Sequence, residues 1–281
     1  MSEAIISKEL QQILSEEIKL YEGPFYKFID FESAKISLSL NNIRFSTPDT
    51  LNDPLECCTE LLKIKDPEKF KEDTYRNLSK REMNPLKKIG LIENFPKYMK
   101  LYNVKKDFSK ILSNSIREIG ICSFSKHYTK DTDYLLWSHY TKGHKGICIE
   151  YDFDSKFLQE NRFIPILVNY KNQLDSYEID FKKGSNDLLP WSVQKLKKIW
   201  AYEDEVRLIN YNLQPDCYGK YHPSIKKAFV SKIIFGCNCS KANMECIFKI
   251  LSDKKYDLKK IKFEKMKLNS EQKLKPKEII L

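Results

Sequence analysis

Strand-forming segments recur along this chain without a regular alternation with helices, and this order is the feature that most constrains its fold class. We expect strands over 25–31, 43–46, 120–125, 146–153, 162–170, 200–209, 227–236 and 260–269. A doubly wound parallel fold would need a helix between nearly every pair of successive strands. The irregular order therefore predicts an α+β fold.

Helical periodicity identifies the helices that complete this fold. We expect helices over 3–21, 32–40, 187–200 and 240–255. Asp30 is placed to cap the second of them, which should stop at the turn formed by Asn41 and Asn42. Residues 56–118 form a lysine-rich block with helix-period apolar positions. We predict a single α+β domain over 1–281, with 56–118 as a helical insertion within it.

Composition bounds the environment of the chain. With 281 residues and 41% apolar residues, the chain can bury a substantial core. No stretch approaches the roughly 18 to 20 apolar residues that a membrane span needs, and the polar first twenty residues lack the apolar core of a signal peptide. The eight cysteines follow no disulfide framework. We therefore expect a cytoplasmic protein with no membrane partner.

The formal charge of +10 raises the alternative of a nucleic-acid-binding protein. Of the 49 basic residues, 43 are lysine and six are arginine, whereas phosphate clamps favour the planar fork of arginine. The final 31 residues nevertheless hold ten lysines and five acids. A non-enzymatic module that binds nucleic acid or a protein partner is therefore kept as an alternative function.

The stretch WAYEDEVRLI, residues 200–209, carries the most unusual charge pattern. In a strand, Glu203, Glu205 and Arg207 would share one face. The ordinary interpretation is a salt-bridged ladder on a surface strand. The functional one is a carboxylate that stabilises a developing cation, with Arg207 keeping the acids ionised.

A second constellation lies in the middle of the chain. Ser123 and Ser125 would share one face of the 120–125 strand, which is either an edge strand with a wet face or part of a site. The segment that follows concentrates Trp137, His139 and Tyr140 with other aromatic groups, as a pocket for a flat heterocycle would. The histidine and cysteine spacings match no standard zinc pattern, so no metal is expected.

The third constellation is the dipeptide Tyr26-Lys27. In a strand Lys27 faces opposite to Tyr26, which gives one apolar face and one face with a cation. Taken alone, this is also the pattern of an ordinary exposed lysine. The chain contains no Walker loop, dinucleotide-binding glycine motif, nucleophile elbow or zincin motif, which argues against the chemistries that use them.

Together these constellations resemble a widespread bacterial family of domains of unknown function, family 2971. The resemblance rests on Tyr26-Lys27, Phe45-Ser46, Asn52-Asp53-Pro54, Ser123-Phe124-Ser125, Trp137-Ser138-His139-Tyr140, Lys145-Gly146 and the segment from Trp200 to Arg207. It spans roughly residues 25 to 250. The pieces are specific as a set, although each alone is weak.

That family is in turn distantly similar to the ADP-ribosyltransferase fold. The similarity lies in the order of a basic residue on the first strand, a Ser-x-Ser strand and a Glu-x-Glu strand, here Lys27, Ser123-x-Ser125 and Glu203-x-Glu205. Lys27 stands where such enzymes usually carry arginine or histidine. The similarity implies a split antiparallel or mixed sheet that grips NAD in a cleft without a glycine-rich loop.

The resemblance implies an NAD-consuming enzyme, either an ADP-ribosyltransferase or an NAD glycohydrolase, that cleaves the nicotinamide–ribose bond. Glu205 would stabilise the cationic sugar, and Glu203 would activate the acceptor. The implied NAD-binding residues are Tyr26, Lys27, Ser123, Ser125, Trp137, His139, Tyr140 and Arg207. A toxin or phage-defence role follows by the same resemblance, with an acceptor macromolecule and a neutralising partner left unidentified. Another nucleotide- or sugar-processing enzyme with the same pocket stays an alternative.

Overall fold

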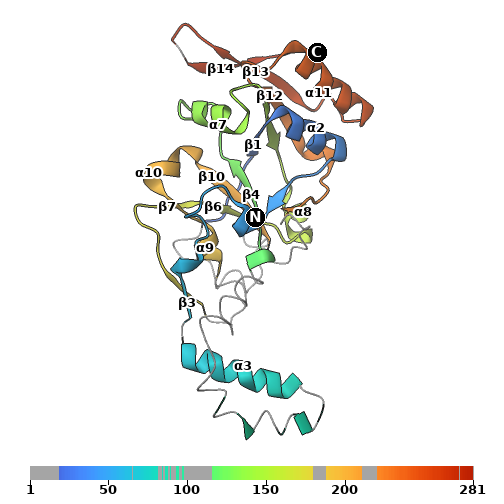
Figure 1. The fold of residues 1–281 in the computed structure, drawn as a ribbon. Coiled ribbons are helices and arrows are strands. Elements are labelled where there is room, and N and C mark those ends of the chain that lie inside the picture. Colours follow the sequence, from blue (N-terminus) through green and yellow to red (C-terminus); the bar gives the residue numbers. More distant parts are fainter. Residues whose placement is uncertain are drawn as a thin grey trace.

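The protein was analysed as a computed structural model, which describes residues 19–64, 66–81, 84, 86, 87, 89, 93, 94, 97, 116–179, 188–210, 220–271 and 273–280. Within these residues a ten-stranded sheet forms the body of the molecule (Figure 1). Its strand order is β11-β2-β4-β1-β5-β12-β13-β14, and β10 pairs with both β4 and β6. The strands are β1 (Phe25–Ile29), β2 (Phe45–Ser46), β4 (Gly120–Ser125), β5 (Ile147–Tyr151), β6 (Ile164–Leu167), β10 (Glu205–Asn210), β11 (Lys220–Tyr221), β12 (Val230–Phe235), β13 (Lys262–Leu268) and β14 (Leu274–Glu278).

Helices and two small sheets complete the described part of the chain. The helices are α2 (Phe31–Leu40), α3 (Pro67–Arg81), α7 (Asp133–Tyr140), α8 (Ser155–Glu160), α9 (Leu189–Ser192), α10 (Lys197–Trp200) and α11 (Lys241–Asp253). One small sheet pairs β3 (Leu62–Ile64) with β8 (Tyr177–Ile179), and the other pairs β7 (Asn169–Lys171) with β9 (Gln194–Leu196). The large sheet is antiparallel except for the parallel pair β12–β13. The predicted mixture of helices with a mixed sheet is confirmed.

Strand β4 divides one of its edges between two partners. Its end at Ser125 pairs with Tyr26 of β1, and its beginning at Ile121 pairs with Ser46 of β2. The register between β1 and β4 consists of that one residue pair, so the two strands diverge beyond it. The other edge of β4 pairs along its whole length with β10. The sheet is therefore open between β1 and β2, and this opening positions the candidate site.

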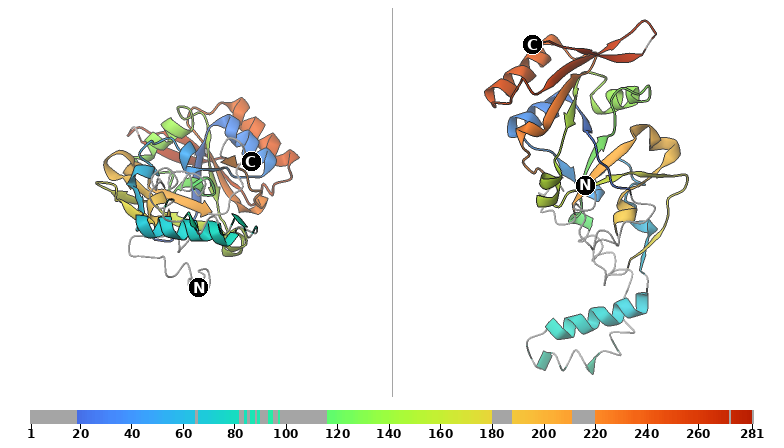
Figure 2. Two further views of the ribbon diagram at one scale, coloured as in Figure 1. Left: turned by 60° about the horizontal axis from the view of Figure 1, so that its bottom comes forward. Right: turned by 180° about the vertical axis from the view of Figure 1, so that it is seen from behind.

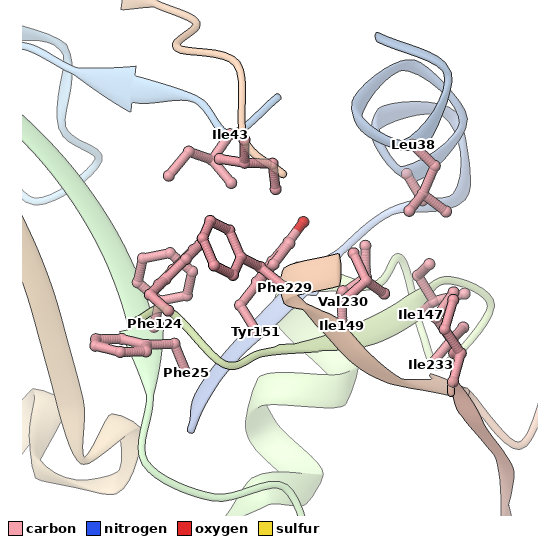
Figure 3. Packing of buried hydrophobic residues seen from close by; sticks show 14 of the residues in the cluster. Phe25, Leu38, Ile43, Phe124, Ile147, Ile149, Tyr151, Phe229, Val230 and Ile233 are labelled. Carbon is pink, nitrogen blue, oxygen red and sulfur yellow. The ribbon is translucent and has the colours of Figure 1, made fainter. Parts of the chain in front are cut away.

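The largest core cluster lies where β1, β4, β5 and β12 meet the helices. Figure 3 shows Phe25, Phe124, Tyr151 and Phe229 packed together, with Ile233 further along the same layer. Helix α11 packs against this layer through side chains that include Phe248, whose ring lies 5.0 Å from that of Phe263. Burial of this apolar surface is the main stabilising contribution to the fold.

Local capping side chains set the ends of two helices, of which the cap and stop of α2 were predicted from the sequence. The Asp30 side chain accepts hydrogen bonds from the backbone N–H groups of the first turn of α2, and Asn41 ends that helix in the left-handed conformation. Ser240 caps α11 by accepting from the N–H of Asn243. Both helices therefore begin within a residue or two of the expected positions.

Other expectations are corrected by tertiary pairing. The segment 162–170 forms two strands, β6 and β7, which join different sheets. The β14 strand was not expected, because its charged, proline-containing sequence lacks strand periodicity. The helix predicted over 3–21 lies outside the described residues except for its last positions.

Helix α3 lies within the predicted insertion. Figures 1 and 2 show α3 well separated from the large sheet. Most of residues 82–115 lie outside the described part, so the insertion over 56–118 stays a prediction. None of the described helices combines the length and the apolar character that crossing a bilayer requires.

Candidate active site

A cavity of about 530 Å³ lies at the opening between β1 and β2. Lys27, Ser125 and Glu205, which are far apart in the sequence, all line it. The lining also includes Tyr26, Ser123, His139, Tyr140 and Glu203 from the predicted set, and Glu56, Lys195 and Arg44, which the sequence interpretation missed. Of the predicted site residues, Trp137 and Arg207 lie outside the lining.

The two glutamates are carried by a turn and a strand rather than by one strand. Glu203 ends the short 3-10 helix η4 (Ala201–Glu203), and Glu205 begins β10. Asp204 lies between them in the left-handed conformation, with φ of 41°. The predicted strand over 200–209 is therefore wrong in its first half, because this turn replaces the alternation. Both carboxylates still point to one place, since they share a cationic partner.

Asp204 stabilises this turn through three basic neighbours. Lys126 and Lys130 approach its carboxylate at 2.6 Å and 2.7 Å, and the His127 ring lies 2.9 Å away. Although partial burial alone would raise the pKa of Asp204, hydrogen bonds from these groups lower it to about 2. The left-handed residue that separates the two glutamates is thus held by charge pairing.

The shared cationic partner of the glutamates is Lys195. Its ammonium donates to Glu203 Oε2 at 2.7 Å and to Glu205 Oε2 at 2.9 Å. Its side chain is 4% exposed and passes 4.7 Å from the centre of the Trp200 ring. The helix predicted over 187–200 is wrong here: the segment breaks into α9, β9 and α10. Pairing of β9 with β7 overrides the helical periodicity and turns Lys195 inward.

Arg207 lies behind the carboxylates rather than in the cavity wall. Its guanidinium is fully buried, donates from Nε to Glu205 Oε1 at 2.9 Å, and also bonds the Ser192 carbonyl and Glu56. Together with Lys195, which bonds Oε2, these contacts hold both oxygens of the Glu205 carboxylate. Arg207 is therefore a positioning residue in this structure.

Glu56 completes a buried cluster of five charged side chains, the carboxylate cluster, formed by Glu56, Lys195, Glu203, Glu205 and Arg207. Its Oε2 lies 3.5 Å from the Lys195 ammonium. Three carboxylates face two cations, so one negative charge is in excess when all are ionised. The expected turn at Asn52-Asp53-Pro54 leads directly into Glu56, and Asn52 lines the cavity beside it.

The pKa values of the cluster follow from this crowding. Burial and the charge of Glu205 raise the pKa of Glu203 above its ordinary value. Burial alone would lower the pKa of Lys195, but the carboxylates of Glu205 and Glu203 raise it overall. Glu203 therefore takes up a proton more readily than an exposed glutamate, and Lys195 stays charged at neutral pH.

Tyrosine hydroxyls complete the hydrogen bonding of the glutamates. Tyr140 donates to Glu203 Oε1, and the Glu205 backbone N–H donates to the Tyr170 hydroxyl at 2.9 Å. Burial, followed by the charge of Glu203, raises the pKa of Tyr140, so this hydroxyl stays a donor. His139 is exposed at the cavity rim, with Nδ1 3.2 Å from the Tyr202 hydroxyl.

The serine strand lies beside the glutamate strand as predicted. Ser125 is opposite Glu205 and Ser123 is opposite Arg207 in the antiparallel register, so these four side chains share one face. Ser125 is buried. The two hydroxyls therefore lie next to the carboxylate cluster at the cavity wall.

Lys27 crosses the opening between the diverging strands. Its ammonium donates to the Ser123 carbonyl of β4 at 2.6 Å and lies 5.2 Å from the centre of the Phe124 ring. Tyr26 projects to the other side of β1, where burial and a hydrogen bond with Glu150 raise its pKa. Lys27 thus satisfies a strand carbonyl and also presents a cation to the cavity.

Trp137 lies in the core and not against the cavity. Its side chain is fully buried, and its ring meets Phe28 edge to face at 5.1 Å. The predicted stacking role is therefore not available to Trp137 in this structure. Tyr140 and His139, which follow Trp137 on the same helix, do line the cavity.

The lining residues that the sequence interpretation missed differ in whether the sequence carried a signal for them. Lys195 lies in the run KLKK and Arg44 directly before the two residues of β2, and neither has a neighbour in the sequence that distinguishes it. Glu56 follows the Asn-Asp-Pro turn, the one signal available for it. The described residues hold no group of three histidine, cysteine or acidic side chains arranged to bind a metal ion.

The fold and the cavity together define a mixed α/β protein with a buried carboxylate cluster at the opening of its sheet. Residues 136–208, about a quarter of the chain, match the family model described as protein of unknown function (DUF2971). The matched segment carries Lys195, Glu203 and Glu205, and its start contributes His139 and Tyr140. No curated protein and no solved structure matches this chain.

Proposed function

We propose that this protein consumes NAD by cleaving the bond between nicotinamide and ribose, in the manner of an ADP-ribosyltransferase or an NAD glycohydrolase. The observation that supports this most directly is that Lys27, Ser125 and Glu205 line one cavity at the opening of the sheet. A volume of about 530 Å³ falls in the range of roughly 300 to 1,000 Å³ typical of small-molecule sites.

The carboxylate cluster suits the electronic demand of this reaction. As the C1′–N1 bond breaks, its electron pair leaves with the nicotinamide nitrogen and positive charge develops on the ribose. A carboxylate fixed beside the ribose stabilises that charge without reorganising. Glu205 is held by Lys195 and Arg207 on both of its oxygens, so it fits this role.

The acceptor then supplies the electrons for the new bond to C1′. It loses a proton in doing so, and we propose that Glu203 takes this proton. Burial and the nearby Glu205 raise the pKa of Glu203, which makes it a stronger base than an exposed glutamate. With water as acceptor the products are ADP-ribose and nicotinamide, and with a macromolecule the product is an ADP-ribosylated chain.

Cations elsewhere in the lining favour a phosphate-bearing substrate over a neutral sugar. Lys27, Arg44 and Lys142 line the same cavity outside the carboxylate cluster. Arg44 and Lys142 are exposed, so they are accessible to a diphosphate entering from solvent. We propose that these groups hold the diphosphate of NAD, and that Tyr140 or His139 contacts the nicotinamide.

The decisive experiment compares Glu205→Gln with the wild type. Released nicotinamide is measured by chromatography after incubation with NAD, and binding is measured separately as the rise in melting temperature that NAD causes. We expect turnover to fall by about 10² to 10³ while NAD still shifts the melting temperature. Glu160→Gln, an exposed change of the same chemistry, is the control and should keep full turnover.

Two results would contradict the proposal. One is a Glu205→Gln protein that releases nicotinamide at the wild-type rate. The other is a wild-type protein whose melting temperature responds to other nucleotides but not to NAD, which would favour a different nucleotide- or sugar-processing enzyme. If NAD is the substrate, induced expression in bacteria should deplete NAD and arrest growth, and Glu205→Gln should not, as expected of a toxin or phage-defence effector.

A further inference from the structure

The last two strands form a hairpin that separates its charges by face. Lys265 lies opposite Lys277 and Lys267 opposite Lys275, so four lysines share one face of β13–β14. We call this set the lysine face. The opposite face carries Glu264 and Glu278 beside apolar groups.

Within the described part of the chain, the positive charges of the lysine face are not paired with opposite charges, whereas Glu264 on the other face has a cationic neighbour. Glu264 lies 3.8 Å from the Lys232 ammonium and accepts from the Tyr128 hydroxyl. Lys265 donates to the Cys239 carbonyl. Lys267, Lys275 and Lys277 are exposed and have no carboxylate within 4 Å among the described residues. Like charges placed directly opposite in a sheet reduce its stability, so the arrangement is unfavourable without an anion.

The position of the hairpin makes this face accessible. Figures 1 and 2 show β13 and β14 extending past the rest of the sheet at the end remote from α3. The sheet order ends at β14, so no further described strand covers its outer edge. Lysines also protect an edge strand from aggregation, but that purpose does not require collecting them on one face.

We propose that the lysine face binds the phosphate backbone of a nucleic acid, independently of any NAD chemistry. Lysines two residues apart on a strand are spaced by about 6.8 Å, and the lysines opposite them by about 5 Å. That pattern places the three exposed ammonium groups, those of Lys267, Lys275 and Lys277, against successive phosphates. Because lysine acts as a point charge, the face would read charge and not base sequence. A two-stranded ribbon also fits the width of the DNA major groove.

The test is the salt dependence of binding to a labelled DNA duplex and to a single-stranded RNA, followed by fluorescence anisotropy between 50 and 200 mM salt. For duplex DNA the slope of log K against log salt changes by about 0.9 for each phosphate contact. The variant carrying Lys267→Gln, Lys275→Gln and Lys277→Gln should therefore lose about 2.7 of the slope. The control carries Lys69→Gln, Lys80→Gln and Lys156→Gln, the same charge change at exposed positions remote from the hairpin.

The expected result is a reduced slope for the hairpin variant and an unchanged slope for the control. Melting of the hairpin variant at or above the wild-type temperature would show that its fold is intact. The wild-type protein supplies an independent readout, since bound nucleic acid should protect the exposed lysines Lys267, Lys275 and Lys277 from acetylation detected by mass spectrometry.

Three outcomes would overturn the proposal. The first is that neither nucleic acid binds with a measurable salt dependence. The second is that the control loses as much of the slope as the hairpin variant. The third is that the hairpin lysines are protected only by anionic lipid vesicles or by an acidic protein and not by DNA or RNA.

Discussion

Replacement of Lys195 by methionine is the most informative perturbation of the carboxylate cluster. Methionine has a similar length and no charge, so the change removes the ammonium that bonds both Glu203 and Glu205 while keeping most of the packing. The three carboxylates of the cluster would then face only Arg207. Removing one partner of a buried ion pair costs about 3 to 5 kcal/mol, and we expect a loss of this size at pH 8.

The loss should depend on pH in a defined direction. The cluster can relieve the uncompensated charge by protonating a carboxylate, and Glu203 is the most suitable because burial and Glu205 already raise its pKa. A folded-state pKa above the unfolded value means that the folded protein binds more protons, so stability falls as pH rises through this range. The destabilisation caused by Lys195→Met should therefore decrease by up to about 1.4 kcal/mol for each unit by which the pH is lowered. This decrease should end at a pH near the pKa of an unfolded glutamate.

The assay is urea denaturation followed by circular dichroism at pH 8 and at pH 6, on the variant and the wild type. Lys69→Met, at an exposed position of α3, is the matched control and should change stability by less than about 0.5 kcal/mol. A free energy of unfolding for Lys195→Met within about 1 kcal/mol of the wild-type value at pH 8 would contradict this prediction. So would a difference between variant and wild type that is the same at both pH values.

Three further predictions concern Asp204, Trp137 and Ser240. Asp204→Asn should reduce the loss of stability that the wild type suffers as pH falls from about 4 to 2. The pKa of Asp204 is lowered to about 2, so the stabilisation from its carboxylate is fully present only above this pH range. Urea midpoints at pH 4 and pH 2.5 test this, and identical acid sensitivity of variant and wild type would contradict it. Trp137→Ala should lower the free energy of unfolding by about 3 to 5 kcal/mol, because it truncates a core side chain. If the ring served mainly to stack on the substrate, the variant would instead lose NAD binding with little loss of stability. Ser240→Ala should destabilise the protein by about 1 kcal/mol through loss of the α11 cap and leave the proposed NAD turnover unchanged. A change in that turnover would show that the cap acts on the site.

Much of the local structure follows from the sequence alone. Asp30 and Ser240 begin helices because their side chains satisfy backbone N–H groups within three residues, so the signal and its effect lie close together in the chain. The serine strand was predictable for a similar reason, since alternation over six residues fixes which side chains share a face. The separate segments that contribute Lys27, Ser125 and Glu205 to the site were likewise expected from local patterns and the family resemblance.

Tertiary structure alone decided how the charges of the site are balanced. Lys195 lies in a segment with helical periodicity, and only its pairing with β7 makes it a strand residue whose ammonium points inward. Glu56 reaches Arg207 across 151 positions of sequence, a separation that no local pattern encodes. Trp137, in contrast, was assigned to the site by its chemistry and was taken into the core by packing.

The physical reason is the range over which each kind of interaction acts. Caps, turns and alternation depend on neighbours within a few residues, and the amino-acid sequence of this protein determines them directly. A buried charge is tolerated only where distant segments supply its partners, because removing it from water is costly. The sequence by itself therefore determined which residues could do chemistry, and the packed fold decided which of them are held together to do it.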